Sequence, residues 1–214
     1  MVRLLTILFL SVLSVSPSLS QNNIQKGYVV TLNNDTLSGY IKYRNNRFNC
    51  TKCIYYSKTD NKPITFLPGE IYSYRFNDSK YYVSRKIKKG SIEKWVFLEY
   101  LVNGIANLYF QKDNDGVHYF IEKDTDLIEL TNKITIVRAR LDNGYTGEVF
   151  KESFSYRGVL SAIFSDAMQL QFEIKNARFN RKSLIKLTED YHNLVCTDRG
   201  CIIYEKDIKI QDKQ

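Results

Sequence analysis

The chain has 214 residues, with 31 Lys and Arg against 23 Asp and Glu, which gives a formal net charge of +8. Only two histidines and three prolines accompany 16 tyrosines and 12 phenylalanines. So few histidines argue against histidine-dependent catalysis or metal binding, and the abundance of aromatic residues with Val, Ile and Thr favours strands.

Residues 1–20 have the pattern of a secretory signal peptide. Arg3 precedes an apolar stretch that is short for a membrane span, and Ser18 and Ser20 are the small residues that a cut after Ser20 requires. The alternative is a retained membrane anchor. We expect an exported protein of the periplasm or cell surface, with no transmembrane segment in the mature chain. Nucleic acid is then not an expected partner, whereas anionic envelope polymers and lipid head groups are.

Short alternating runs predict antiparallel strands as far as residue 150 or so. Outside the central region they are expected at 27–32, 37–43, 53–57, 62–67, 71–76, 80–85, 127–130, 134–141 and 145–150. The residues Asn33-Asn34-Asp35-Thr36 accept turn dihedrals and predict the turn between the first two strands.

The strongest local signal lies between Trp95 and Lys123, which reads as three antiparallel strands joined by an Asn103-Gly104 turn and a loop with Asp115-Gly116. Asn-Gly favours a two-residue type I′ turn, and this turn predicts a register in which Val102 faces Ile105 and Leu98 faces Tyr109. Both faces of the resulting ribbon are largely apolar. We therefore expect it to be covered on both sides and to form a core, not an active site.

From Tyr156 the hydrophobic residues follow helical spacing, which predicts a first helix there. A second short helix is expected from Asp166, with Ser165 as its N-cap, and the clearest helix runs from Arg181 to Val195 with Asn180 as its N-cap. The predicted fold is α+β. An antiparallel β region covers residues 21–152, as a meander or as sandwich-like sheets. A helical region over 153–214, ending in a cysteine loop, packs on the sheet within the same domain.

Several segments carry a resemblance to a known family. They are GYVVTLNNDTLSGYIKY, IYSYRFNDSKYYVSRK, VFLEYLVNGIANLYF, HYFIEK, SLIKLTEDYHNLVC and CIIYEK. Together they resemble an uncharacterised family of exported Bacteroidota proteins, whose domain often precedes an outer-membrane β-barrel. The resemblance covers nearly all of residues 24–206 and implies an envelope location. Because no barrel strands are expected before Gln214, an outer-membrane partner would be engaged in trans.

Four cysteines in an exported chain predict disulfides, and their connectivity stays open. Cys196 with Cys201 would close a small loop containing Gly200, while Cys50 with Cys53 would need a turn at 51–52. A four-thiolate zinc site and a redox pair at Cys50 and Cys53 are the alternatives.

No other constellation predicts catalytic, cofactor-binding or metal-binding residues. His118 reads as a packed or half-exposed strand residue and His192 as part of a solvated helix face. Asp113-Asn114-Asp115-Gly116 matches only part of a calcium loop, so a hairpin turn is the simpler interpretation. We expect no cofactor.

Two features suggest contact with other molecules. Aromatic residues lie beside basic ones at Tyr81, Tyr82, Arg85 and Lys86, which form a candidate interaction surface. Asp35-Thr36-Leu37 resembles the O-glycosylation acceptor of Bacteroidota envelope proteins, which makes Thr36 a candidate glycosylation site.

The sequence favours a non-enzymatic binding module of the envelope that contacts a protein or an anionic polymer. The alternative is a hydrolase of envelope glycans or peptides, with a carboxylate pair drawn from distant strands, because such a pair leaves no local motif. A purely structural domain is a third hypothesis.

Overall fold

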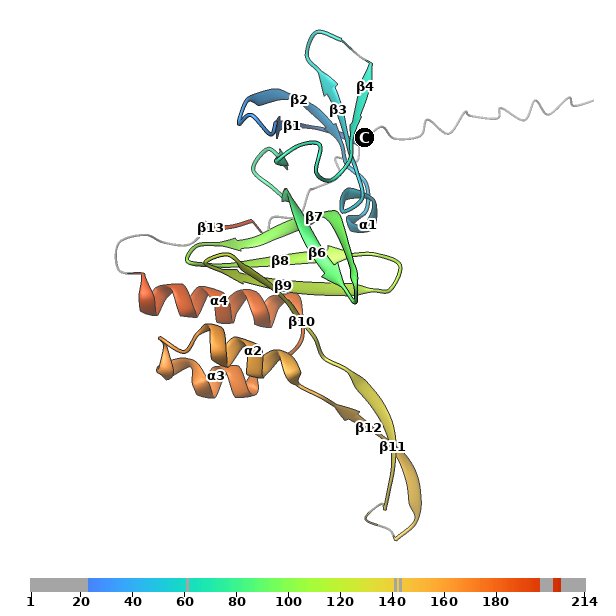
Figure 1. The fold of residues 1–214 in the computed structure, drawn as a ribbon, viewed down its shortest axis with the longest axis vertical. Coiled ribbons are helices and arrows are strands. Elements are labelled where there is room, and N and C mark those ends of the chain that lie inside the picture. The colour runs from blue at the N-terminus through green and yellow to red at the C-terminus, as the bar shows by residue number, and fades with distance from the viewer. Residues whose placement is uncertain (1–22, 61, 141, 143, 197–201, 205–214) are drawn as a thin grey trace, which may run out of the picture.

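A computed structural model describes residues 23–60, 62–140, 142, 144–196 and 202–204. One long antiparallel sheet dominates it, with the strand order β10-β9-β8-β7-β6-β5-β1-β2-β3-β4 and a short strand β13 added to β7. Three helices pack below the sheet in the view of Figure 1, and a separate two-stranded sheet projects away from them. The fold is therefore α+β, antiparallel through the N-terminal two-thirds and helical toward the C-terminus. The proposed signal peptide lies outside the described residues.

Five strands and the short helix α1 (Asn46–Asn49) form the N-terminal half; the first four strands pair in chain order, and the fifth returns to pair with the first. The strands are β1 (Ile24–Val30), β2 (Thr36–Lys42), β3 (Cys53–Ser57), β4 (Pro63–Phe66) and β5 (Ser73–Phe76). Asn45 caps α1 by accepting a hydrogen bond from the Phe48 N–H (2.9 Å). The first turn spans residues 31–35, since Val30 pairs with Thr36, and Asn34 adopts a left-handed conformation in it.

The second half of the sheet continues as a meander. Its strands are β6 (Tyr81–Lys89), β7 (Ile92–Asn103), β8 (Ala106–Lys112), β9 (Val117–Lys123) and β10 (Asp126–Leu130). The short strand β13 (Ile202–Ile203) lies outside the meander and pairs with the end of β7. The strands predicted from the sequence are all present, and their ends differ by a few residues.

The predicted register of the central hairpin is wrong. Tyr100 pairs with Tyr109 and Glu99 with Phe110, and a bulge precedes the pairing of Val102 with Leu108. Neither Asn103 nor Gly104 has a positive φ, so the turn is not type I′. Gly104 is required for another reason: a Cβ there would lie 2.5 Å from the His192 ring. The helix that packs on the hairpin therefore shapes this turn.

The helical region contains α2 (Ser155–Ile163), a 3-10 turn (Met168–Leu170), α3 (Gln171–Asn176) and α4 (Arg181–Val195). Helix α4 has the predicted bounds, and Asn180 caps it by accepting from the Ser183 N–H (2.9 Å). The second helix begins later than predicted, because the backbone turns between Phe164 and Ala167 and no cap forms at Ser165.

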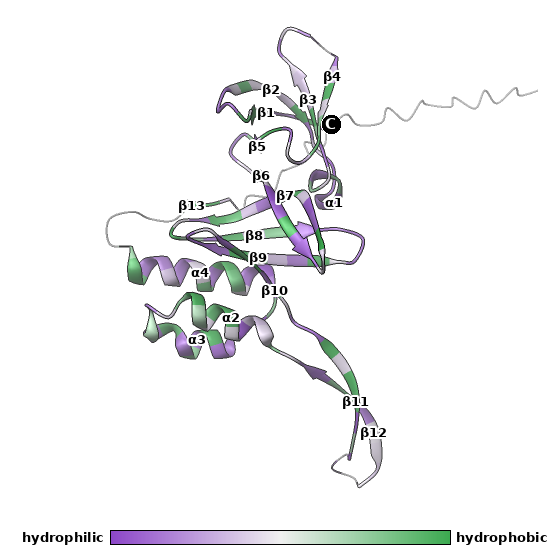
Figure 2. Cartoon of the chain, in the orientation of Figure 1, coloured by the Kyte–Doolittle hydropathy of each residue, from purple (hydrophilic) through white to green (hydrophobic). Residues whose placement is uncertain are grey.

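Three buried clusters fill the space around the sheet, and Figure 2 shows the apolar stretches that form them. The largest joins one face of β7–β9 to α2, α3 and α4, through residues such as Leu108, Phe110 and Tyr191. The other face of the central strands carries Leu98 and Tyr109, which are also buried. The central ribbon is thus buried on both faces, as its composition predicts. The remaining cluster lies in the N-terminal half, around Tyr74 and Phe97.

A buried carboxylate joins the helices to both halves of the sheet. Glu99 on β7 is fully buried and contacts Arg181 at the start of α4. The same carboxylate lies 3.6 Å from Lys80 Nζ, which also donates to Asn46 Oδ1 in α1 (2.9 Å). One side chain in the middle of β7 thereby links α4, the β5–β6 turn and α1.

Candidate functional site

Most residues of the two-stranded sheet are exposed. It consists of β11 (Ile134–Arg140) and β12 (Thr146–Glu152), which pair with each other in register and with no other described strand. Figure 1 shows this hairpin, here called the arm, extending away from the helices. Seven extended residues per strand give it a length of about 23 Å.

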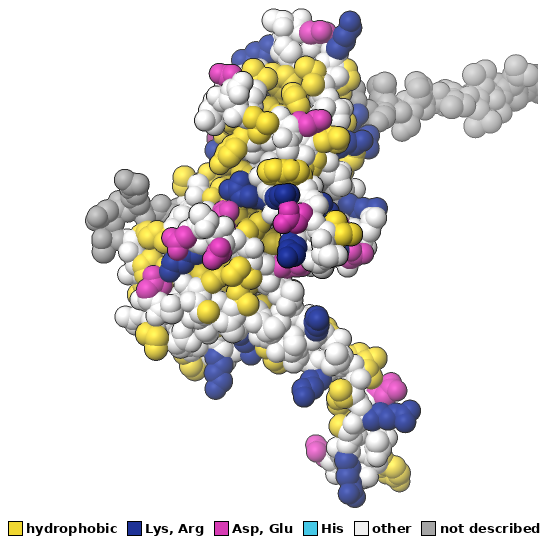
Figure 3. Space-filling view, in the orientation of Figure 1, with side chains coloured by type: hydrophobic (Ala, Val, Ile, Leu, Met, Phe, Trp, Pro, Cys, Tyr) yellow, Lys and Arg dark blue, Asp and Glu magenta, His cyan; other side chains and the backbone are white. Residues whose placement is uncertain are grey.

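The arm exposes large apolar side chains on one face. Ile136 pairs with Phe150, and Ile134 lies two residues earlier on the same face. The exposed fractions are 62% for Ile134, 59% for Ile136 and 77% for Phe150. Figure 3 shows hydrophobic side chains along the arm between charged ones. A surface of this kind is typical of contact with another molecule.

Charged residues occupy the outer part of the same face. Arg138 faces Glu148 across the two strands, and Arg140 lies beyond them toward the tip. The arm therefore combines an apolar patch near its base with a charged outer end, which is the composition of an interface with an apolar centre and a polar rim.

Polar side chains at the base of the arm hold it to the body. The Lys133 N–H donates to Ser153 Oγ (2.9 Å), and the Phe154 N–H donates to Asn132 Oδ1 (3.1 Å). Ser155 Oγ donates to the Thr131 carbonyl (2.5 Å), at the start of α2. These side-chain bonds fix the direction in which the arm leaves the helices.

The turn from the arm into α2 passes through a strained residue. Phe154 has a φ of 49°, in the left-handed region that bulky residues rarely adopt. The guanidinium of Arg157 stacks on its ring at 4.1 Å and helps to hold it in place. Strain of this kind persists only where the surroundings enforce it, so the angle between arm and body is a built feature.

The four residues of the predicted interaction surface do not share one face. They follow each other on β6, where Tyr82 points into the core with no exposed area and stacks on Tyr74 at 4.8 Å. Lys86 is exposed and forms an ion pair with Glu93 (2.6 Å). The alternation of a strand separates these two from Tyr81 and Arg85, which are partly buried.

Arg85 belongs to an internal polar network. Its Nε lies 3.2 Å from Glu122 Oε1, and Glu122 also accepts from the Tyr109 hydroxyl and from Asn107 Nδ2 (3.2 Å). Burial acts to raise the pKa of Glu122, but the Tyr109 hydroxyl and Arg85 outweigh it and lower that pKa. Arg85 is thus engaged by the protein itself.

The cysteines in the described chain carry free thiols. Cys50 ends α1 and Cys53 begins β3, and both are buried in the N-terminal cluster. A turn does lie between them, at residues 50–51 and not at 51–52, yet no bond joins the two thiols. Burial raises the pKa of Cys50 to about 12 and also raises that of Cys53, which leaves them unreactive. Cys196 is partly exposed, and its predicted partner Cys201 lies outside the described residues.

Both histidines are occupied by neighbours. His118 lies between two carboxylates, with Nε2 at 3.0 Å from Asp113 Oδ1 and Nδ1 at 2.8 Å from Glu129 Oε1. Asp113 also accepts a hydrogen bond from the Asp115 N–H (2.8 Å), so its side chain stabilises this loop as a hairpin turn. His192 is buried, not solvated as predicted, and its Nε2 accepts from the Ala106 N–H (3.1 Å). Burial lowers the pKa of His192.

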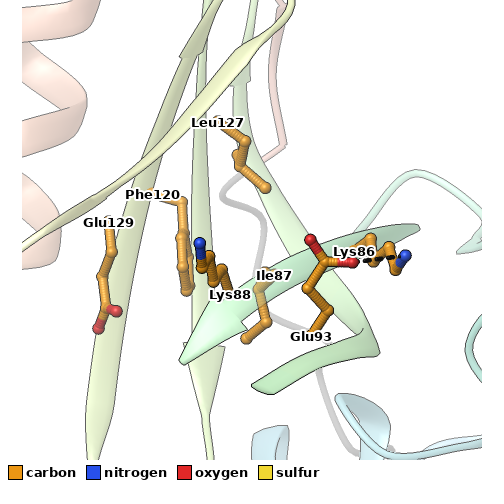
Figure 4. Close-up of a pocket in the computed structure, with 7 residues that line it drawn as sticks. All are labelled: Lys86, Ile87, Lys88, Glu93, Phe120, Leu127 and Glu129. Atoms are coloured by element: carbon orange, nitrogen blue, oxygen red, sulfur yellow. Dashed lines mark ion pairs between the residues drawn. The ribbon is translucent and has the colours of Figure 1, made fainter. Parts of the chain in front are cut away.

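A pocket of about 170 Å³ lies beside the β6–β7 hairpin, where Lys86, Ile87, Lys88, Glu93, Phe120, Leu127 and Glu129 line it. Figure 4 shows Glu93 next to Lys86 and Glu129 on the far side of Phe120 and Lys88. A hydrogen bond from Lys86 and its charge lower the pKa of Glu93. Each of the two carboxylates has a partner of its own, Lys86 for Glu93 and His118 for Glu129.

Thr36 is exposed at the first position of β2. This position is accessible to a modifying enzyme, and the glycosylation remains a prediction.

Within the described ranges, no three His, Cys, Asp or Glu side chains are grouped to hold a metal ion. The same residues include no helix of the length and hydrophobicity needed to cross a bilayer.

The sequence predicts the two strands of the arm. It does not predict that their apolar side chains stay exposed. The alternation of Ile134, Ile136 and Phe150 looks the same in a strand that packs on a core. Comparison of the chain with known protein families, curated proteins and solved structures found no match.

Proposed function

We propose that this protein is a non-enzymatic binding module of the bacterial envelope, exported to the periplasm or cell surface, and that it contacts a protein partner through the arm. The observation that carries the proposal is the exposed apolar face formed by Ile134, Ile136 and Phe150 on a hairpin that pairs with no other described strand. The signal-peptide pattern of residues 1–20 and the resemblance to exported Bacteroidota proteins support the location.

Physical chemistry favours a partner for this element. A two-stranded hairpin is at best marginally stable in water by itself, because one pair of strands buries little apolar surface. Full burial of one large apolar side chain contributes about 1.5–3 kcal/mol. Covering the three apolar residues would therefore contribute several kcal/mol to the binding free energy. The entropic cost of association offsets part of this gain. The free outer edges of β11 and β12 also offer backbone groups to a partner strand.

The hydrolase alternative requires two carboxylates that face each other across a pocket, one with a raised pKa to act as the acid. Of the two in the pocket of Figure 4, Glu93 has a lowered pKa and pairs with Lys86, while Glu129 pairs with His118. Their arrangement favours a binding function over hydrolysis.

A pull-down with matched variants tests the proposal. The wild-type protein and the variant Ile136→Ser/Phe150→Ser are immobilised and exposed to solubilised envelopes of the source organism. The control is Met168→Ser/Phe172→Ser, which removes two equally exposed apolar side chains from the helical region (69% and 74% exposed). We expect a protein that is retained by the wild type and the control and lost with the arm variant. Equal retention by all three proteins would overturn the proposal.

A further inference from the structure

A second surface, on the N-terminal half of the sheet, has the form and charge of a ligand site. It is a pocket of about 360 Å³ lined by Lys26, Gly27, Tyr28, Ser38, Gly39, Tyr40, Lys58 and Asn77. These residues come from β1, β2, the segment that follows β3 and the turn after β5. None of them belongs to the arm or to the pocket of Figure 4.

The pairing of β1 with β2 builds this pocket. Gly27 lies opposite Gly39, with Lys26 opposite Tyr40 on one side and Tyr28 opposite Ser38 on the other. The two glycines are buried and the flanking side chains point outward, so backbone forms the floor between two pairs of polar or aromatic side chains. A Cβ on Gly27 would lie 2.4 Å from the Arg75 carbonyl oxygen. This close packing behind the floor excludes larger residues at that position.

The lining is positively charged. Among the described residues that line it are two lysines and no Asp or Glu. Lys26 and Lys58 are both exposed, and within the described ranges neither forms an ion pair. The side chains of Ser38 and Asn77 add a hydroxyl and an amide, which both donate and accept hydrogen bonds.

The net charge of the chain is concentrated in the same half. Residues 23–80 contain nine Lys and Arg and four Asp and Glu, a net charge of +5. Residues 81–204 are more than twice as many but contain 18 basic and 16 acidic residues, a net charge of +2. The electrostatic field around the pocket therefore attracts anions. Basic residues are spread evenly along the sequence, and the two halves differ because acidic residues are fewer in the first.

We propose that this pocket binds a saccharide that carries carboxylate or phosphate groups. Two ammonium groups at its rim supply point charges for the anion, and the phenol rings of Tyr28 and Tyr40 offer flat apolar surfaces to the C–H face of a sugar ring. Ser38 and Asn77 are placed to bind sugar hydroxyls. The volume is at the lower end of the range for ligand pockets and suits one or two sugar units. The site is independent of the arm.

Isothermal titration of the purified mature chain tests the proposal with four probes: a tetramer of galacturonic acid, glucose 6-phosphate, inorganic phosphate and a neutral maltotetraose. The site variant is Lys26→Gln/Lys58→Gln. Its control, Lys175→Gln/Lys182→Gln, removes the same two charges from exposed positions on the helices. A third variant, Tyr40→Ala, removes one ring. The urea midpoint of each protein confirms that it is folded.

We expect at least one of the two anionic saccharides to bind, and which of them binds more tightly distinguishes a carboxylate from a phosphate ligand. The site variant should weaken that binding at least tenfold, the control less than twofold. Tyr40→Ala should weaken the saccharide but not inorganic phosphate. Equal weakening by the two charge variants would show unspecific attraction and overturn the proposal. Tight binding of maltotetraose, or no binding of either anionic saccharide, would overturn it as well.

Discussion

Ile136 and Phe150 lie directly opposite each other on the arm, and each exposes more than half of its surface. In the sheet of the body, directly paired apolar residues such as Tyr100 and Tyr109 are buried and stacked, with ring centroids 4.6 Å apart. Paired apolar side chains are thus covered in the central sheet and left exposed on the arm.

The first prediction concerns the stability of the arm variant. Because Ile136 and Phe150 contribute little to the folded core, Ile136→Ser/Phe150→Ser should change the free energy of unfolding by less than about 1 kcal/mol. Urea denaturation followed by circular dichroism measures this, with Leu108→Ala in the core as the comparison, for which we expect a loss of about 2–5 kcal/mol. A loss of that size in the arm variant would show that the arm packs on the body.

The second prediction concerns Gly104. Its replacement by Ala would place a Cβ 2.5 Å from the His192 ring, and we expect a loss of about 1–3 kcal/mol from overpacking. In a His192→Ala background the same change should cost clearly less, because the obstructing ring is gone. A double-mutant cycle of urea midpoints checks this. Equal costs in both backgrounds would show that the turn needs glycine for its dihedral angles.

The central hairpin also shows which parts of the fold its sequence encodes. Each predicted strand of the hairpin is present, because short runs of aromatic and β-branched residues between turn residues favour strands. The register at 103–104 could not be predicted, because it depends on His192, which is 88 positions away in the chain and packs against the turn. The preference of Asn-Gly for a type I′ turn is a local tendency, and the packing of α4 overrides it.

The exposure of the arm could not be predicted from the sequence either. Ile134, Ile136 and Phe150 follow the same alternation as the buried strands, so a pattern that reports sidedness cannot report whether another element covers the apolar side. For the pocket on β1 and β2, the glycines and lysines are visible in the sequence, but only the pairing of Gly27 with Gly39 brings them together. The candidate surface at Tyr81–Lys86 divides between two faces because neighbouring strand residues point in opposite directions.

The third prediction concerns Glu99, the carboxylate that Lys80 and Arg181 share in the protein interior. Glu99→Ala should cost about 3–5 kcal/mol, because it leaves buried positive charge without this anion. The control is Glu173, which is exposed on α3. Its change Glu173→Ala should lower the free energy of unfolding by less than about 0.5 kcal/mol. Chemical denaturation at pH 7 measures both. Similar small losses for the two variants would contradict the role assigned to Glu99.

The fourth prediction concerns the buried thiols. Burial raises the pKa of Cys50 to about 12 and that of Cys53 as well, so at pH 8 almost no thiolate is present at either position in the folded protein. Iodoacetamide should therefore leave both residues unmodified over an hour at pH 8, and modify both in 6–8 M urea, where a thiol pKa of about 8.5 applies. Peptide mapping by mass spectrometry reads each site. Rapid modification of the folded protein, or a bond between Cys50 and Cys53, would contradict the structure.

Photocrosslinking in living cells of the source organism tests the arm most directly. A benzoylphenylalanine at position 150 places the reactive group on the apolar face of the arm, and one at position 172 places it on an equally exposed helical site. We predict one dominant crosslinked protein from position 150, which disappears when Ile136 is also changed to Ser and is absent from position 172. No crosslink from position 150, or the same products from both positions, would contradict a role for the arm as the contact element.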